Sequence, residues 1–227
     1  MYFTSRAEAG KKLAEEIKVD SPADTIVVAL NTGAVEVAEQ IASSLRCRMA
    51  LLLSEDIELP GEQSTIGTVS QSGDFTYNSS LSSGEVDEYY SELHGYIDDQ
   101  KREQFAKINR LLGEGGFVER ESLRNHTTII VSDGFKNTSL LDAAELFLKP
   151  VKIKHLIIAT PVASVQAVDR MHIFGDELHC LNVTDNYIDT NHYYDNNTVL
   201  SHDEILTKIK ITTDSASQDL SDAPAKL

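Results

Sequence analysis

The stretch Thr25–Leu30, with the sequence TIVVAL, and the loop Asn31-Thr32-Gly33-Ala34 that follows it decide the fold. Residues 26–30 are apolar without any alternation, which is typical of a strand covered on both faces, as in a parallel sheet. A helix over Val35–Leu45 and a second buried strand over Met49–Leu53 complete a unit of strand, helix and parallel strand. This pattern predicts an α/β fold.

Further along the chain, the same alternation of strands and helices continues. We expect buried strands over Thr127–Val131, Ile153–Ala159 and Leu178–Val183, a helix over about 140–148, and a helix that ends near Met171. A helix over 6–18, with Ser5 and Glu8 as a capping box, precedes the first strand. These elements predict a three-layer α/β/α fold with a mostly parallel central sheet. Because ligands bind beyond the carboxyl ends of such strands, the loops of interest are 31–34, 54–62, 132–139 and 160–164.

Residues 54–112 form an insertion between the second and third of these strands. Its first part, 54–84, is expected to be irregular, with two short strands over Thr65–Ser70 and Asp74–Tyr77. A heavily charged helix follows over Glu85–Leu112; Gly95 is a candidate interruption, and Gly115-Gly116 ends the helical pattern. We therefore predict a single domain over residues 1–211 that contains this loop and helical insertion. The Ser-, Asp- and Ala-rich tail, 212–227, is expected to be disordered.

The composition narrows the classes of partner. The 227 residues include 20 Lys and Arg against 36 Asp and Glu, a formal net charge of −16, which argues against a nucleic acid or an anionic membrane as partner. The first residues contain no apolar segment of a signal peptide, and no apolar run is long enough to span a bilayer. Cys47 and Cys180 are far apart and the histidines lack metal-ligand spacing, so no disulfide or metal site is predicted. We expect a cytoplasmic protein.

Five segments of the chain follow one another in a recognisable order: Phe3–Ala14, Ala29–Ala38, Glu62–Gly67, Ile129–Leu140 and Ala159–Ala163. The first is a Phe-x-x-Arg-x-x-Ala-Gly-x-x-Leu-Ala helix, and the fourth is a buried strand followed by Ser132-Asp133-Gly134 and a polar loop. With Tyr193–Asp195 and Asp203–Ile205, the set resembles the type I phosphoribosyltransferases, specifically their stand-alone bacterial group of unassigned substrate. The resemblance covers residues 3 to 210 and implies the phosphoribosyltransferase fold, in which dimers are common.

The resemblance implies a substrate, phosphoribosyl pyrophosphate (PRPP) with Mg²⁺, and a reaction in which a nitrogen nucleophile displaces pyrophosphate from the sugar. The residues implied to bind the ribose and its 5′-phosphate are Ser132, Asp133, Gly134, Lys136, Asn137, Thr138 and Ser139. Asp133 would hold the ribose hydroxyls, and the start of the next helix would hold the phosphate through backbone N–H groups. The loop Asn31-Thr32-Gly33-Ala34 would hold the pyrophosphate.

Several residues depart from the family pattern. Ser132 replaces the first acid of the pair, the glycine of the Thr-Gly-x-Thr loop is lost, and the loop 31–34 carries no arginine. Glu55 and Asp56 stand where a lysine is usual and would repel a diphosphate. Each lost donor can be worth about 3–4 kcal/mol of transition-state stabilisation. Arg6 is unfavourable to the dipole at a helix N-terminus, which indicates that it pairs with an acid across the fold.

Three interpretations remain open. The first is a phosphoribosyltransferase-fold protein with weakened or lost catalysis that binds a phosphoribosyl compound or nucleotide, or that serves a regulatory role. The second is an active Mg²⁺-dependent transferase that uses Asp133 and an unidentified nitrogen acceptor. The third is a structural α/β subunit without a small ligand, in which Asp133 is a turn residue, Lys136 a solvated lysine, and Gly33 and Gly67 turn glycines.

Overall fold

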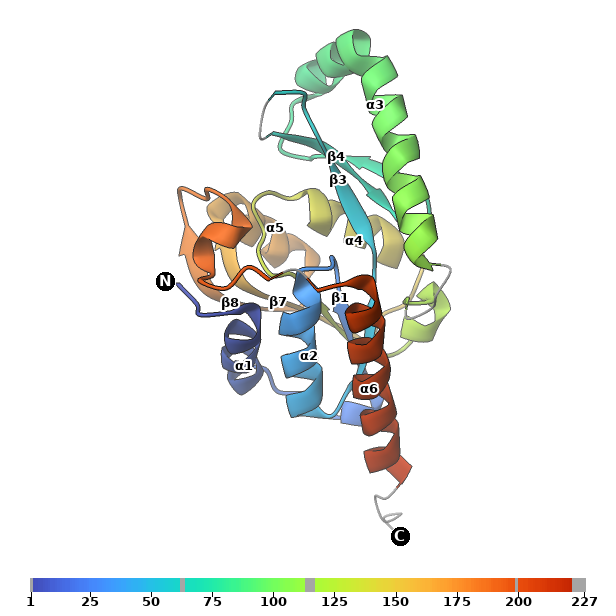
Figure 1. Ribbon diagram of the computed structural model, residues 1–227, viewed down its shortest axis with the longest axis vertical. Coiled ribbons are helices and arrows are strands. Elements are labelled where there is room, and N and C mark those ends of the chain that lie inside the picture. The colour runs from blue at the N-terminus through green and yellow to red at the C-terminus, as the bar shows by residue number, and fades with distance from the viewer. Residues whose placement is uncertain (1, 62–63, 113–116, 199, 222–227) are drawn as a thin grey trace.

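The computed structural model describes residues 2–61, 64–112, 117–198 and 200–221 (Figure 1). Its central sheet has five strands in the order β2-β1-β6-β7-β8, and every neighbouring pair is parallel. The strands are β1 (Thr25–Ala29), β2 (Arg48–Leu51), β6 (Thr127–Val131), β7 (His155–Ser164) and β8 (Glu177–Thr184). The predicted α/β fold with a mostly parallel sheet is therefore confirmed.

Helices cover both faces of this sheet. One core cluster joins Val27 and Ala29 of β1 to α1 (Arg6–Glu16), α2 (Ala34–Leu45) and α6 (His202–Ser221). A second cluster joins Ile26 and Val28 to α4 (Ser139–Leu148) and α5 (Val165–Phe174) on the opposite face. Both faces of β1 are thus buried, which is the physical reason why its sequence shows no polar alternation. Short 3₁₀ helices occupy Pro22–Asp24, Arg120–Leu123 and Thr190–Tyr193.

The insertion, residues 54–112, is a second small sheet with one long helix, seen at the top of Figure 1. The antiparallel strands are β3 (Ser54–Glu58), β4 (Thr65–Ser70) and β5 (Phe75–Tyr77), and the helix is α3 (Ser83–Leu112). Two expectations were wrong here: Ser54–Glu58 is a strand and not part of a loop, and α3 continues through Gly95. A helix tolerates an exposed glycine at a cost of about 1 kcal/mol, which packing of other α3 residues offsets.

The predicted loop 160–164 is also wrong, because β7 continues to Ser164. Pro161 has no N–H to donate, and it falls at the position that the β7–β8 register skips between Thr160 and Val162. Beyond it, Val162 and Ala163 pair with Asn182 and Val183 of β8. The strand β7 therefore runs past Pro161 to Ser164, and α5 starts at the next residue, Val165.

The tail was expected to be disordered from residue 212, but α6 runs to Ser221. Thr212 and Ala216 are buried, and the Thr213 hydroxyl donates to the carbonyl of Met49 at 3.0 Å. This contact ties the helix to the edge strand β2. Residues 222–227, Glu62 of the quoted Glu62–Gly67 segment, and the Gly115-Gly116 break lie outside the described residues. Among the helices of the described ranges, none combines the length and apolarity that crossing a membrane requires.

Candidate functional site

An open cavity of about 700 Å³ lies beneath the insertion, at the carboxyl ends of β6, β7 and β8. We call it the strand-end cavity. The loop after β6 contributes Lys136 and Asn137, the start of α5 contributes Ser164–Gln166 with Asp169, and the segment after β8 contributes 185–187. The insertion closes it from above with Ser64, Thr65, Asn78 and Ser80. Almost every group in this lining is polar, so the cavity suits a polar ligand.

The predicted loop 132–139 is divided between the protein interior and this cavity. Only Lys136 and Asn137 line it, whereas the residues on either side of them are buried. The Ser132 hydroxyl makes its hydrogen bonds within the loop: it donates to the Gly134 carbonyl at 2.9 Å and accepts from the Gly134 N–H. A hydroxyl that is already paired in this way cannot replace the missing acid of the family pattern.

The helix that follows this loop is covered by the insertion. Thr138 Oγ1 donates to Asn78 Oδ1 at 3.2 Å and lies 2.8 Å from Ser79 Oγ. Ser139 is fully buried, its N–H donates to Asn137 Oδ1, and its hydroxyl has no hydrogen-bond partner within the described part of the chain. The direct approach of a phosphate to the first turn of α4 is therefore obstructed at Thr138, and Lys136 and Asn137 are the residues of this loop that line the cavity.

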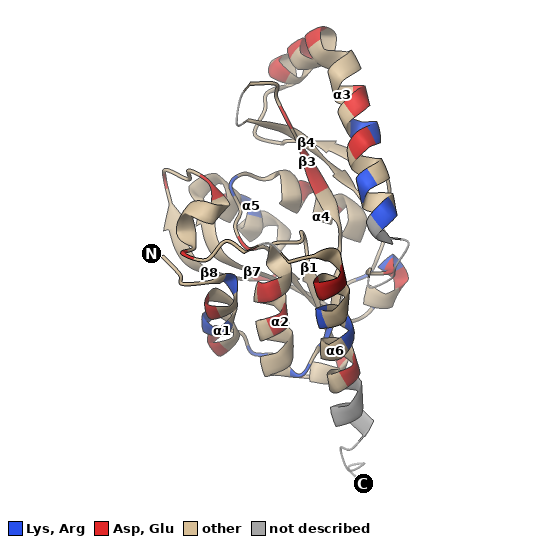
Figure 2. Cartoon of the chain, viewed as in Figure 1, with Lys and Arg blue, Asp and Glu red and all other residues tan. Residues whose placement is uncertain are grey.

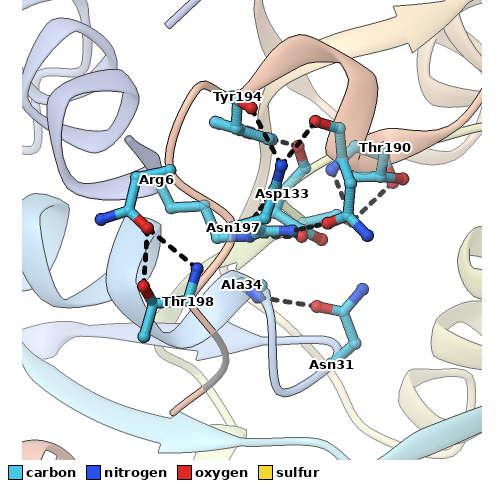
Figure 3. Close-up of polar contacts among 12 residues, drawn as sticks. Arg6, Asn31, Ala34, Asp133, Thr190, Tyr194, Asn197 and Thr198 are labelled. Atoms are coloured by element: carbon cyan, nitrogen blue, oxygen red, sulfur yellow. Dashed lines mark hydrogen bonds and ion pairs between the residues drawn. The ribbon is translucent and has the colours of Figure 1, made fainter. Parts of the chain in front are cut away.

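Asp133 is held in a buried ion pair, and the sequence expectation that Arg6 pairs with an acid across the fold is confirmed. Arg6 Nε donates to Asp133 Oδ2 at 2.8 Å, and each side chain is about nine-tenths buried. The other guanidinium nitrogens donate to Asn191 Oδ1 at 2.8 Å and to Asn197 Oδ1 at 3.2 Å. Figure 3 shows this group, in which the segment after β8 folds over the pair.

Tyr194 closes the pair from one side. Its ring centroid lies 4.6 Å from the Arg6 guanidinium carbon, and its hydroxyl donates to the backbone carbonyl of Asp133. Burial raises the pKa of the Tyr194 hydroxyl well above its usual value, and the nearby Asp133 carboxylate acts in the same direction. The phenol is therefore a fixed hydrogen-bond donor at neutral pH that covers one side of the pair.

The loop 31–34 lies beside this ion pair and not in the strand-end cavity. A Cβ at Gly33 would lie 2.3 Å from Asp133 Oδ2, so the close approach of that carboxylate requires glycine. Asn31 Oδ1 accepts from the Ala34 N–H at 2.7 Å and caps the start of α2 (Figure 3). Thr32 and Gly33 line a separate cavity of about 170 Å³ together with Arg6. The two predicted sets of ligand residues thus meet at Asp133 but open into different cavities.

The charges around the strand-end cavity are mixed. Lys136 and the start of α5 are electropositive, whereas Asp169 and Asp185 are acidic. On β3, burial raises the pKa of Asp56 to about 6, although the Thr68 hydroxyl, which donates to Oδ1 at 2.5 Å, lowers it. The positive charge of Lys136 lowers the same pKa, so Asp56 and Lys136 interact electrostatically across the base of the insertion.

Sequence reasoning missed Asp169, Asp185 and Tyr187 as lining residues. The signal for the last two was present: they follow the fifth expected strand, and ligands bind beyond the carboxyl ends of parallel strands. Asn78 and Ser80 had no such signal, because only the packing of the insertion over the sheet brings them there.

Comparisons with known proteins agree with this architecture. No family model matches the chain. Two curated relatives, each named a putative phosphoribosyl transferase, come from two strains of Mycobacterium tuberculosis. Each is 24% identical over 230 residues, an alignment that covers 98% of this chain and 49% of the relative. The chain therefore spans about half the length of the curated relatives it matches.

Among solved structures, a protein from Thermus thermophilus superposes with a TM-score of 0.67 at 20% sequence identity. The match covers 92% of this chain and 98% of that protein, so nearly the whole fold is shared. The sequence similarity to the named transferases extends over the same elements, from α1 through the loop 132–139 to α6. The chain is therefore similar to the type I phosphoribosyltransferases in the order of its motifs and elements.

Proposed function

We propose that this protein binds a phosphoribosyl compound or a nucleotide in the strand-end cavity and that its transferase catalysis is weakened or lost. One observation carries the proposal: Asp133, the remaining acid of the family's pair, is buried against Arg6, while Lys136 and Asn137 of the same loop line the cavity. The phosphate of a ligand can therefore contact Lys136 and Asn137, but Asp133, the acid that would orient the ribose, is paired with Arg6.

The groups that would stabilise a departing pyrophosphate are also weak. The loop 31–34 has no cationic side chain, and Arg6, which lines the same small cavity, is neutralised by Asp133. Pyrophosphate develops negative charge as it leaves, and enzymes stabilise such charge with preorganised donors worth about 3–4 kcal/mol each. Because the loop 31–34 lacks such donors, the site is better suited to binding a ligand than to catalysing the release of pyrophosphate.

Mg²⁺ accompanies PRPP in the family that this chain resembles. Mg²⁺ takes oxygen ligands, usually one or two carboxylates together with phosphates of the substrate. Across the described ranges, no three His, Cys, Asp or Glu side chains gather as a metal would need. Asp133 Oδ2, an oxygen of the one acid in the predicted ligand loop, accepts a hydrogen bond from Arg6. The described residues therefore form no cluster that would hold Mg²⁺ without phosphates of a substrate, and we derive no step that depends on it.

Calorimetric titration of PRPP and of nucleoside monophosphates, with and without Mg²⁺, tests the proposal. We expect micromolar binding by the wild type and a loss of at least tenfold in Lys136→Ala. Lys149→Ala is the matched control, because Lys149 is exposed at the opposite end of α4. Equal weakening by both substitutions, or no binding of any of these compounds, would contradict the proposal and favour a structural α/β subunit.

The second candidate, an active transferase with an unidentified nitrogen acceptor, is tested by pyrophosphate release. PRPP is incubated with Mg²⁺ and a panel of nucleobases and amines, with wild type and Asp133→Asn compared. Turnover at the ordinary rates of enzymes, above about 1 s⁻¹, and its loss in Asp133→Asn would establish this alternative and overturn the proposed loss of catalysis.

A cytoplasmic location belongs to the same proposal. Cys47 and Cys180 are both free thiols, and burial raises the pKa of each to about 11. Thiols of this kind are protonated and poor nucleophiles at neutral pH. They agree with a protein that works in a reducing compartment without using cysteine chemistry.

A further inference from the structure

The strand-end cavity has a positive side and an acidic side, and the topology of the sheet separates them. Strand β7 lies between β6 and β8, and it leads directly into α5. Lys136 follows β6 on one side of the α5 N-terminus, whereas Asp185 follows β8 on the other. A ligand that fills the cavity therefore meets a cation at one end and a carboxylate at the other.

The positive side suits a phosphate. Helix α5 has ten residues, and the first N–H groups of a helix have no partner within it. Ser164 Oγ accepts from the Ala167 N–H at 3.2 Å, and Ser164, Val165 and Gln166 line the cavity. The N–H groups of this turn, the helix dipole and the Lys136 ammonium together attract an anion.

The acidic side suits a hydrogen-bond donor. Asp169 and Asp185 line the cavity together with Tyr187, whose ring offers a surface for a flat base. An ionised carboxylate only accepts hydrogen bonds, so it pairs with an amino group and repels a carbonyl oxygen placed at the same point. The volume of about 700 Å³ lies within the ordinary range for small-molecule sites and is sufficient for a mononucleotide.

We propose that the cavity selects a nucleoside monophosphate whose base carries an exocyclic amino group. Its phosphate lies toward Lys136 and the start of α5, and its amino group donates to Asp185 or Asp169. This inference rests on the proposed function, because it names the ligand class of the same cavity. Bases that present a carbonyl oxygen at that position, such as hypoxanthine, are disfavoured.

The experiment compares AMP with IMP, which differ by an amino group against a carbonyl on the same purine position. We expect the wild type to bind AMP about tenfold more tightly, as a hydrogen bond to a charged acceptor provides. Asp185→Asn, Asp169→Asn and the double variant should reduce this preference, because an amide can donate to a carbonyl as well as accept. Asp20→Asn removes the same charge from an exposed position before the amino end of β1, at the opposite edge of the sheet, and should leave the preference unchanged.

The outcomes separate this inference from the proposed function. Lys136-dependent binding of AMP and IMP with equal affinity would overturn the inference and leave the proposed function standing. A preference for AMP that survives in the double variant would overturn it as well. If Mg²⁺ raises the affinity for both nucleotides equally and Asp185→Asn abolishes that gain, the acids bind a metal and the inference is wrong. Failure of PRPP and of every nucleotide to bind would overturn both.

Discussion

At the scale of single residues, Arg6 and Asp133 determine the character of the site. The guanidinium bonds Asp133, Asn191 and Asn197 and lies against the Tyr194 ring, so one side chain joins α1, the loop after β6 and the segment after β8. A buried ion pair of this kind contributes little net stability compared with apolar residues, but losing one partner is costly. The pair also removes Asp133 from the ligand cavity.

Replacing Arg6 should therefore destabilise the fold strongly. Arg6→Met leaves the Asp133 carboxylate buried without its partner, and we expect the free energy of unfolding to fall by about 3–5 kcal/mol. Urea denaturation measures it. Lys11→Met on the same helix is the control, because Lys11 is exposed and its replacement should change little. A loss for Arg6→Met no larger than that of the control would contradict a structural role for the pair.

Asp56 provides a prediction of pH dependence. Burial raises its pKa to about 6, above that of an unfolded chain, so the folded state binds this proton more tightly than the unfolded state. The contribution of Asp56 to stability is therefore greatest below pH 4 and is lost as the pH rises through 6. We expect Asp56→Asn to raise the free energy of unfolding by about 1–3 kcal/mol at pH 7 and by little at pH 4.

Urea denaturation at several pH values measures this difference, and Asp87→Asn on α3 is the control for simple loss of one negative charge. Asparagine keeps an acceptor for the Thr68 hydroxyl, so the hydrogen bond across β3 and β4 can remain. If Asp56→Asn were less stable than the wild type at pH 7, the carboxylate would have to be ionised at a net benefit, contrary to the effect of its burial.

At the scale of elements, helix termini and strand ends decide which side chains reach the cavity. The segment Lys136–Asn137 is exposed to it because Phe135 is anchored beside β7, where its N–H donates to the Val162 carbonyl at 3.0 Å. Thr138 and Ser139 then turn inward under the insertion at the start of α4. One loop therefore has a structural half and a half that can bind a ligand.

The last helix, α6, is a structural element, and a matched pair of substitutions tests it. Ala216 is only 3% exposed, whereas its neighbour Ser215 is exposed. Ala216→Asp would bury a charge against the core, and we expect a loss of at least about 2 kcal/mol in the free energy of unfolding. Ser215→Asp should be nearly neutral. Equal effects in thermal or urea denaturation would show that α6 does not pack as described.

At the scale of the whole molecule, the insertion lies over the carboxyl edge of the sheet (Figure 1) and contributes one wall of the strand-end cavity. Acidic residues are spread over the elements, and the basic residues of α3 lie in its second half, while others lie on α1 and α6 and elsewhere (Figure 2). Lys101 and Lys107 of α3 are turned to the small sheet, where Lys107 pairs with Glu55 at 2.8 Å. These cations serve internal pairing within an acidic molecule.

The net charge of −16 leads to a prediction for the whole molecule. Sequence-independent binding of DNA requires several unpaired Lys or Arg contacts to phosphates, with dissociation constants of about 10⁻⁴–10⁻⁶ M at physiological salt. We expect fluorescence anisotropy with labelled duplex DNA and single-stranded RNA to show weaker binding than this range. Saturable binding at micromolar protein that weakens steeply with added salt would contradict the expectation that nucleic acids are not partners.

The parallel sheet could be predicted from the amino-acid sequence alone, because its central strands β1, β6 and β7 are mostly apolar on both faces and such runs are distinctive without any partner in view. The sequence also indicated the ordered loops that resemble the transferase family, and the need of Arg6 for a distant acid. It did not show that β3 is a strand, that β7 continues past Pro161 or that α6 is ordered to Ser221. Those outcomes depend on pairing and burial against residues far away in the chain.

The folding of the whole chain places Asp133 against Arg6 while Lys136 and Asn137 line the strand-end cavity, and no local sequence pattern predicts this division. Neighbouring residues of a loop have no periodicity that predicts which side they take. Their direction is set by what the folded chain places around them: Gly33, Tyr194 and the segment after β8 on one side, and the insertion on the other. The composition of a site can thus be anticipated from a motif, whereas its charge pairing is a property of the packed molecule.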